Sequence, residues 1–279
     1  MGDRPSKATG DDRGPIEINR NVAHAVRIYD YLLGGNDNFA ADRAAAEAMA
    51  VAYGGLDNAM AYARDNRDYL NRVVHYLVNQ AGLRQFLNIG IGIPSPENAY
   101  ALPQALPQET RVVYVDDDPL VLAHAHSLLR RDREGATDFF EADLREPESI
   151  LERARATVDL AQPVAIVVTN LHFVGPDDDP YGIIGRLVEG VSPGSHLAMC
   201  HLSNDLQTAE RTAALQQLSA ATRETFSLRS HDEVERFFAG LDLVEPGVVQ
   251  IARWRPTETG RESADSGVAP FHGGVGQKP

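Results

Sequence analysis

Residues 85–94, which read QFLNIGIGIP, constrain the fold more than any other stretch of this chain. Apolar residues come first, and Gly90 and Gly92 follow two positions apart, as at the end of a buried parallel strand. Glycine here lets the backbone of the turn approach a ligand closely, because a side chain would hold that ligand away. A helix beginning near Ser95 would point its N-terminal N–H groups at the same crevice. An ordinary strand–helix turn can carry the same glycine pair, so this feature needs support from the rest of the chain.

From residue 84 onward the chain alternates apolar runs with helical segments, which is typical of a parallel sheet covered on both faces. Strands are predicted at residues 86–89, 111–115, 137–140, 164–169 and 196–201. Helices are predicted at residues 95–106, 119–131, 147–157, 180–191 and 206–222. Ser230 and Glu233 form a capping box that opens one more short helix. Two last strands, at 241–245 and 248–254, are separated only by a Pro-Gly pair, which predicts an antiparallel hairpin.

The part of the chain ahead of this sheet is predicted to be helical. Helices are expected at residues 19–33, 39–52 and 57–80. The first two are joined by two glycines and the polar run Asn36, Asp37 and Asn38, with Asn38 as the N-cap of the second helix. The chain therefore divides into a flexible leader (1–18), a helical N-terminal cap (19–83), an α/β core (84–256) and a disordered Gly/Ser/Pro-rich tail (257–279).

Charge and composition exclude several classes of partner. The net charge of −14 disfavours binding to nucleic-acid phosphates or anionic lipid, and no apolar run is long enough to cross a membrane. The N-terminus has no apolar segment of the secretory kind. Cys200 is the only cysteine, which rules out an intramolecular disulfide, fits a cytoplasmic protein and favours a core residue over a nucleophile. The oligomeric state is left open.

Acidic residues follow the second and third predicted strands. Asp116, Asp117 and Asp118 come directly after residues 111–115. A carboxylate at the end of the second strand can accept both ribose hydroxyls of an adenosine cofactor, and Asp116 is the candidate, while Asp118 fits a helix cap. Asp143 falls at the end of the third strand, where it could meet an adenine amine. The alternative is that these aspartates are caps or solvated side chains.

The fourth predicted strand ends in Asn170, Leu171 and His172. His172 could be a general base, a substrate ligand, or a histidine that is hydrogen-bonded to a loop carbonyl. No metal is expected, because the chain has no His-Glu-x-x-His or paired Cys-x-x-Cys motif. The run of aspartates at 177–179 lacks the other features of a calcium loop and fits a solvated loop or a helix cap.

Taken together, the Gly-x-Gly turn, the acids after strands two and three and Leu-His-Phe after strand four resemble the Rossmann-like class I S-adenosylmethionine-dependent methyltransferases. Three stretches are more specific: RIYDYLLGGNDNF at 27–39, VYVD at 113–116 and VEPG at 244–247. They resemble the bacterial S-adenosyl methyltransferase family of unassigned substrate that was once catalogued as a domain of unknown function. The resemblance spans residues 19–256 and implies a mostly parallel, doubly wound sheet with S-adenosyl-L-methionine as cofactor.

The resemblance also implies roles for single residues. Gly90 and Gly92 would pass under the methionine part of the cofactor, and Asp116 would hold its ribose. Asp143 and Leu144 would frame its adenine. The candidate cofactor set is completed by three neighbouring residues, Asn88, Asp117 and Asn170.

Residues 31–38 would, by the same resemblance, form a lid that contributes to the acceptor pocket. Tyr29 belongs to the apolar stripe of the first helix, which leaves Tyr31 as the tyrosine for that pocket. The chain departs from the family at Asn88, where aspartate is common, and at Ile91, where threonine is common. Both departures are expected to weaken cofactor affinity without blocking the site.

The leading hypothesis is methyl transfer from S-adenosylmethionine to a small-molecule acceptor. His172, Tyr31 and Asp37 are the candidates for acid–base work, which is required only if the acceptor must lose a proton. A second hypothesis, motivated by the two departures, is a catalytically silent protein that binds S-adenosylmethionine or S-adenosylhomocysteine and has a regulatory role. A nicotinamide oxidoreductase is disfavoured, because Pro94 and Ser95 stand where a third glycine would be expected.

Overall fold

The computed structural model describes residues 19–90, 92, 107, 109–118, 121, 123, 137–222, 226–256 and 269–279. Its centre is one sheet of eight strands in the order β3-β2-β1-β4-β5-β8-β6, with β7 also paired to β8. The parallel strands are β1 (Gln85–Ile89), β2 (Arg111–Asp116), β3 (Thr137–Glu141), β4 (Ala165–Val168) and β5 (His196–Leu202). The predicted α/β class and mostly parallel sheet are confirmed. The helices predicted at 95–106 and 119–131 lie outside the residues that the structure describes, apart from positions 121 and 123.

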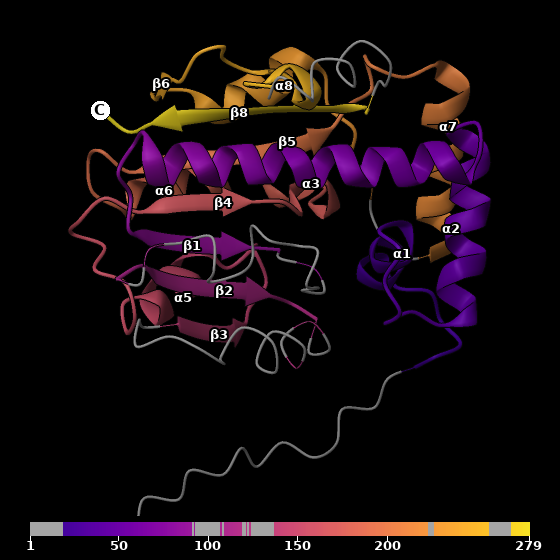
Figure 1. Cartoon of the computed structure of the whole chain (residues 1–279), viewed down its shortest axis with the longest axis horizontal. Helices are drawn as coiled ribbons and strands as arrows, with labels where there is room; N and C mark the ends of the chain where they lie inside the picture. The colour runs from indigo at the N-terminus through magenta and orange to yellow at the C-terminus, as the bar shows by residue number, and fades with distance from the viewer. Residues whose placement is uncertain are drawn as a thin grey trace, which may run out of the picture.

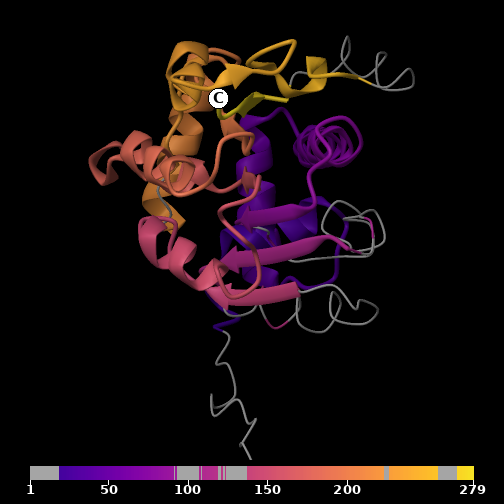
Figure 2. The same ribbon diagram turned by 90° about the vertical axis from the view of Figure 1, so that its left-hand side faces the viewer.

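Helices cover both faces of the sheet, because successive strand residues point to opposite sides. Phe86 in β1 packs with the residues of α3 (Leu56–Asn79), whereas its neighbour Leu87 packs toward α5 (Pro147–Ala154) and α6 (Pro180–Glu189). Figures 1 and 2 show α3 on one face and these two helices on the other. The central strands are therefore buried on both sides and almost uniformly apolar.

The C-terminal part of the sheet differs from the prediction. β8 (Phe271–Gln277), in the supposed disordered tail, lies between β5 on one side and β6 (Asp242–Leu243) and β7 (Val249–Gln250) on the other. The antiparallel strands are present, but β6 and β7 pair with β8 and do not form the predicted hairpin with each other.

The sequence of β8, FHGGVGQ, does not predict a strand, because glycine is normally depleted in strands. Here the glycines make room for a helix. A Cβ on Gly273 would lie 2.8 Å from the ring of Tyr69 in α3. The Tyr69 hydroxyl lies 2.9 Å from the carbonyl oxygen of Met199 and 3.1 Å from that of Gly274, so it links α3 to both β5 and β8.

A second layer of helices lies beyond the carboxyl ends of the parallel strands. Figure 1 shows α1 (Ala25–Leu32), α2 (Ala40–Ala52) and α7 (Ala209–Thr222) grouped there, and the long α3 reaches them from the sheet. Their apolar side chains form a third core cluster, separate from the two on the sheet faces. We call these helices, with the adjoining end of α3, the helical cap. The cap faces the edge of the sheet at which ligands bind in open α/β folds.

Short helices complete the chain. They are η3 (Leu171–Phe173), η4 (Pro176–Asp178), α8 (His231–Glu235), η5 (Arg236–Phe238) and η6 (Ile251–Arg253). The predicted capping box is present, since the Ser230 hydroxyl accepts from the Glu233 amide and the Glu233 carboxylate accepts from the Ser230 amide.

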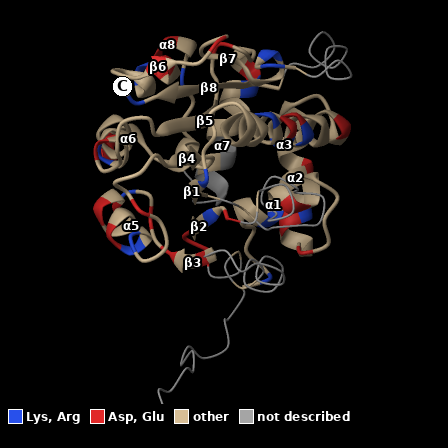
Figure 3. Ribbon diagram, turned by 60° about the vertical axis from the view of Figure 1, so that its left-hand side comes forward, with Lys and Arg blue, Asp and Glu red and all other residues tan. Residues whose placement is uncertain are grey.

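Charged residues lie mainly on the helices, and the strands are mostly free of them (Figure 3). Within the described part of the chain, no helix is long and apolar enough to cross a membrane.

Candidate functional site

A cavity of about 260 Å³ lies between the carboxyl ends of the strands and the helical cap. Eight of the predicted site residues share its wall: Gly90, Gly92, Asp116, Asp117, Asp143, Leu144, Asn170 and His172. They come from the ends of β1 and β2, from the loop after β3 and from the segment after β4. Segments far apart in sequence thus meet at one edge, as the parallel order of the strands requires.

The two glycines of the turn after β1 have different surroundings. Gly90 has a φ of 77°, and a Cβ there would lie 2.3 Å from the side-chain carbon Cγ of Asn170. Gly92 has a φ of 65°, but a Cβ there would meet no atom within 4 Å. The first glycine is therefore required by packing, whereas the second leaves open space on the cavity side of the backbone.

Asp116 is the buried acid of the site. It ends β2 with 3% of its surface exposed, and its two carboxylate oxygens accept hydrogen bonds from the backbone N–H groups of Gly92 (3.3 Å) and Asp118 (3.0 Å). Burial raises the pKa of Asp116 to about 7, although these hydrogen bonds act in the opposite direction. Burial also raises the pKa of the adjacent Asp117. An acid with a strongly perturbed pKa on a cavity wall is a mark of a functional site.

Asp143 and Leu144 line the cavity beside a basic residue that sequence analysis did not single out. The carboxylate of Asp143 accepts from the backbone N–H of Arg145 at 2.8 Å and from its guanidinium at 3.2 Å. Arg145 also pairs with Asp178 at 3.1 Å and raises the polar content of this wall. Its place directly after Leu144 was the available signal in the sequence.

His172, in η3, is surrounded by aromatic rings. Its ring centroid lies 4.1 Å from that of Phe173 and 6.3 Å from that of Phe226. Burial and the positive charge of Arg229 lower the pKa of His172 to about 4. Its Nδ1 is enclosed and has no hydrogen-bond partner among the described residues. His172 is therefore a neutral imidazole at physiological pH and a weak base.

The structure does not bring Tyr31, Asp37 or Asn88 to the cavity wall. Tyr29 lines it instead, with its hydroxyl 3.1 Å from the carbonyl oxygen of Ala63 in α3. Tyr29 packs with the third core cluster, as predicted, but it also lines the cavity, whereas Tyr31 is not among the lining residues. The reason is that the apolar stripe of α1 faces the cavity, so a residue can belong to both.

Asp37 lies in a turn that is organised by the buried Asp30. One Asp30 carboxylate oxygen accepts from the Asp37 amide at 2.8 Å and from the Asn38 side chain at 2.9 Å. A Cβ on Gly35 would lie 2.0 Å from the other oxygen, so only glycine fits there. Asn38 serves this turn and is not the N-cap of α2, which is Phe39. The unusual run of polar residues therefore has a structural role, and the Asp37 side chain itself is exposed.

The two departures from the family pattern have different outcomes. Asn88 is 6% exposed in β1, and its side-chain oxygen has no partner in the described part of the structure. Ile91 lies outside the described residues.

A further cavity residue without a sequence signal is His24, which lies ahead of α1. Its Nδ1 lies 3.2 Å from a carboxylate oxygen of Asp118.

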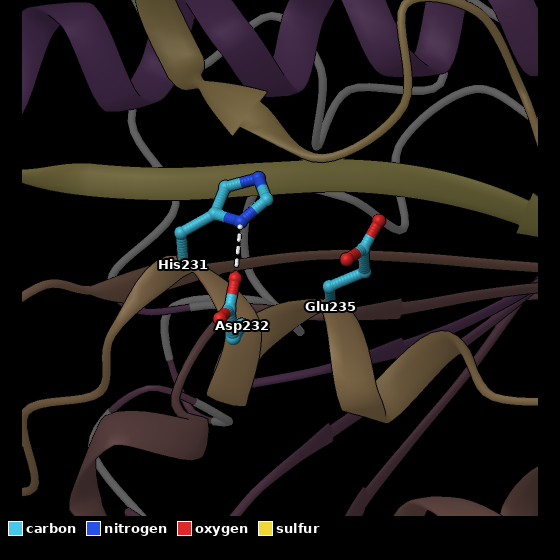
Figure 4. Close-up of side chains that lie close together, drawn as sticks. All are labelled: His231, Asp232 and Glu235. Atoms are coloured by element: carbon cyan, nitrogen blue, oxygen red, sulfur yellow. Dashed lines mark hydrogen bonds and ion pairs between the residues drawn. The ribbon is translucent and has the colours of Figure 1, made fainter.

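Among the described residues, potential metal ligands gather at one place away from the cavity. Ligand atoms of His231, Asp232 and Glu235 lie within 4.8 Å of one another (Figure 4). Both imidazole nitrogens of His231 have protein partners, Nδ1 the Asp232 carboxylate at 3.1 Å and Nε2 the carbonyl oxygen of Val248 at 2.9 Å. These contacts hold α8 against the loop before β7.

Asp179, the last of the three aspartates at 177–179, is the N-cap of α6. This agrees with the interpretation of that run as a helix cap.

The strand order, the glycine turn after β1 and the acid that ends β2 define a Rossmann-like methyltransferase of class I. The sequence pattern of the S-adenosyl methyltransferase family matches residues 11–279. The chain therefore belongs to that family, whose methyl donor is S-adenosylmethionine. No curated protein matches the chain.

Solved structures agree with this assignment. A DUF574 family protein from Streptomyces avermitilis is 40% identical, with a TM-score of 0.83, and the match covers 92% of this chain and 98% of that one. A candidate methyltransferase from Thermobifida fusca is 35% identical, with a TM-score of 0.78 and coverages of 92% and 96%. Magnesium protoporphyrin IX methyltransferase from Synechocystis, solved with bound SAH, is 12% identical over 79% of this chain and 87% of its own, with a TM-score of 0.50. That last likeness shows the fold alone.

Proposed function

We propose that this protein transfers the methyl group of S-adenosylmethionine to a small-molecule acceptor that binds in the cavity under the helical cap. The observation that carries the proposal is the hydrogen bond between the Gly92 amide and the Asp116 carboxylate on the cavity wall. It joins the glycine turn after β1 and the acid that ends β2 into one unit. That unit has the two parts that a nucleoside cofactor needs from such a fold, an open backbone and a ribose acceptor.

The residues present fit the cofactor. The Asp116 carboxylate can accept from both ribose hydroxyls, and the apolar Leu144 suits one face of the adenine ring. The open side of Gly92 leaves room for the methionine chain. The side-chain oxygen of Asn170, on the cavity wall, is enclosed and has no partner among the described residues, so it can accept from the methionine ammonium group.

When bound, S-adenosylmethionine supplies a methyl group made electrophilic by its sulfonium. The task of the chain is then to align the acceptor and to exclude water. The helical cap does the second by closing the cavity from the side opposite the sheet. His172, on the cavity wall, offers a neutral imidazole. A neutral imidazole suits hydrogen bonding to the acceptor better than proton removal at neutral pH. No observation on the described residues favours the alternative of a silent binding protein.

Calorimetry with S-adenosylhomocysteine and with NAD tests the proposal. We expect saturable binding of S-adenosylhomocysteine at one site per chain and none of NAD, because a third glycine of the dinucleotide motif is missing. Replacing Glu245, which is exposed and outside the cavity, by alanine provides a control that should bind equally well. Absence of heat with S-adenosylhomocysteine, or equal binding of NAD, would refute the assignment of the cavity.

A further inference from the structure

The third apolar cluster of the molecule is hollow. Several of its members line the cavity instead of packing against one another on all sides. We call the space next to them the inner chamber, and define it by Ile28, Met49, Tyr53, Tyr62, Leu215 and Phe271. All but Phe271 of β8 come from α1, α2, α3, α7 or, for Tyr53, the C-cap of α2, so the chamber is built mainly by the helical cap. An unfilled apolar space costs packing contacts in the folded protein, because protein interiors are normally close-packed. A bound ligand would restore these contacts, so the space is a candidate ligand site.

Charge is segregated within the cavity. The carboxylate and guanidinium side chains among its described lining residues are Asp116, which ends β2, and Asp117, Asp143 and Arg145, which follow β2 or β3. The imidazoles of His24 and His172 line the cavity as well. The stretches of α2, α3 and α7 that line the cavity contribute only apolar, tyrosine and asparagine side chains. A charged acceptor placed in the inner chamber would lose its hydration without gaining an ion pair, which is costly.

Aromatic rings shape the chamber and its boundary. Tyr53 and Tyr62 pack edge to face, with ring centroids 5.2 Å apart and planes at 84°. His172 lies where the chamber meets the nucleotide edge, with its ring centroid 6.5 Å from that of Phe271 and 6.3 Å from that of Phe226. Because Nδ1 of His172 is enclosed, Nε2 is the ring nitrogen left for a ligand. Flat aromatic guests pack well against such edges and faces.

We propose that the inner chamber is the acceptor subsite and that it takes an uncharged aromatic molecule whose single polar group meets the imidazole of His172. The proposal rests on the proposed function for the meaning of "acceptor", but binding to the chamber can be measured without methyl transfer. It excludes sugars, amino acids and nucleotides as acceptors, because each would carry charge or many polar groups into a space with few partners.

The test uses three probes of one shape on the full chain saturated with S-adenosylhomocysteine: 2-naphthol, 2-naphthoate and 2-naphthylmethylammonium. Affinity is measured by calorimetry at pH 7. We expect 2-naphthol to bind at least about tenfold more tightly than either charged probe, in line with the cost of an unpaired buried charge. Equal or tighter binding of a charged probe would overturn the proposal, and this comparison needs no variant.

A pair of variants on α2 locates the binding. Met49→Trp fills the chamber and is expected to lower 2-naphthol affinity at least about tenfold, with S-adenosylhomocysteine affinity retained. Val51→Trp, two residues on, is the matched control, because Val51 is 79% exposed on the outer face, and it should change neither affinity. Unchanged 2-naphthol binding in Met49→Trp contradicts the chamber assignment even if the cofactor binds. If the wild type binds 2-naphthol in a way that Met49→Trp abolishes, but does not bind S-adenosylhomocysteine, the chamber assignment stands and only the proposed function is contradicted.

Discussion

Asp116 is held in a position that costs stability. Burial raises its pKa to about 7, so near neutral pH about half of the molecules carry a negative charge that is removed from water. Two backbone N–H groups fix the carboxylate without neutralising it. No basic side chain forms an ion pair with Asp116 among the described residues. A buried carboxylate with a purely structural role would be expected to have a basic partner. A carboxylate that binds the ribose hydroxyls of a cofactor would not need one.

The Asp116→Asn variant should change how stability depends on pH. In the unfolded chain this carboxyl ionises near its ordinary value of 3.8, and in the folded chain near 7. The unfolded state therefore releases the proton first, and stability falls as pH rises between these values. Between pH 5 and pH 8 the wild type should lose about 2–3 kcal/mol more stability than the variant in urea unfolding. The buried histidines contribute equally to both proteins, so parallel pH profiles would show that Asp116 is not perturbed.

The site residues at strand ends could be predicted from the sequence, whereas those on the helical cap could not. The positions of Gly92, Asp116 and Asn170 follow from a local pattern, because a parallel strand delivers its last residue to a common edge. Tyr29 reaches the cavity through the packing of α1 against α3, and His24 through its contact with Asp118 after β2, and no local pattern contains either contact. The departure at Asn88 was expected to touch the cofactor, but the residue lies in β1, off the described cavity wall.

At the scale of elements, the turn between α1 and α2 is held by two buried acids that accept hydrogen bonds from its backbone. Asp30 and Asp42 together accept from the backbone of Asp37, Phe39 and His24, so this turn is held from inside. The predicted lid is therefore a fixed part of the fold in this structure. The proposal that residues 31–38 contribute to the acceptor pocket is supported at Leu32, which lines the cavity.

The Gly35→Ala variant tests the importance of this turn. The new Cβ would lie 2.0 Å from the Asp30 carboxylate and must displace it from the Asp37 amide. We expect a loss of about 1–3 kcal/mol in the free energy of unfolding, typical of a buried hydrogen-bond network that is broken. Gly185→Ala, inside α6 with no atom within 4 Å of the new Cβ, is the control and should be neutral or stabilising. Equal stability of the two variants would contradict the role given to Asp30.

β8 marks the limit of prediction from sequence at this scale. Most of the parallel strands were predictable because their central residues are apolar, and even β3 (TDFFE) has the pair Phe139 and Phe140. β8 has the composition of a loop, and its strand state depends on β5, on Tyr69 and on two short strands from another part of the chain. Tertiary contacts override local propensity here.

The whole molecule combines the ligand-binding edge of an open α/β sheet with a helical cap that faces it. The sheet supplies the glycine turn and the acids, and the helical cap supplies an apolar chamber closed over them. The first part could be predicted from sequence, together with the class of cofactor. The second could not, because the shape and charge of the chamber depend on how α1, α2, α3 and α7 pack around a space.

The most direct measurement is the affinity for S-adenosylhomocysteine at pH 6 and pH 8, in the wild type and in Asp116→Asn. A carboxylate with a pKa of about 7 accepts from both ribose hydroxyls best when it is ionised. Wild-type affinity should therefore rise by up to about tenfold between these pH values. Affinity in the variant should be lower at pH 8 and independent of pH. Tight binding in the variant, with the same affinity as the wild type at both pH values, would contradict the assignment of Asp116 and of the cavity to the cofactor.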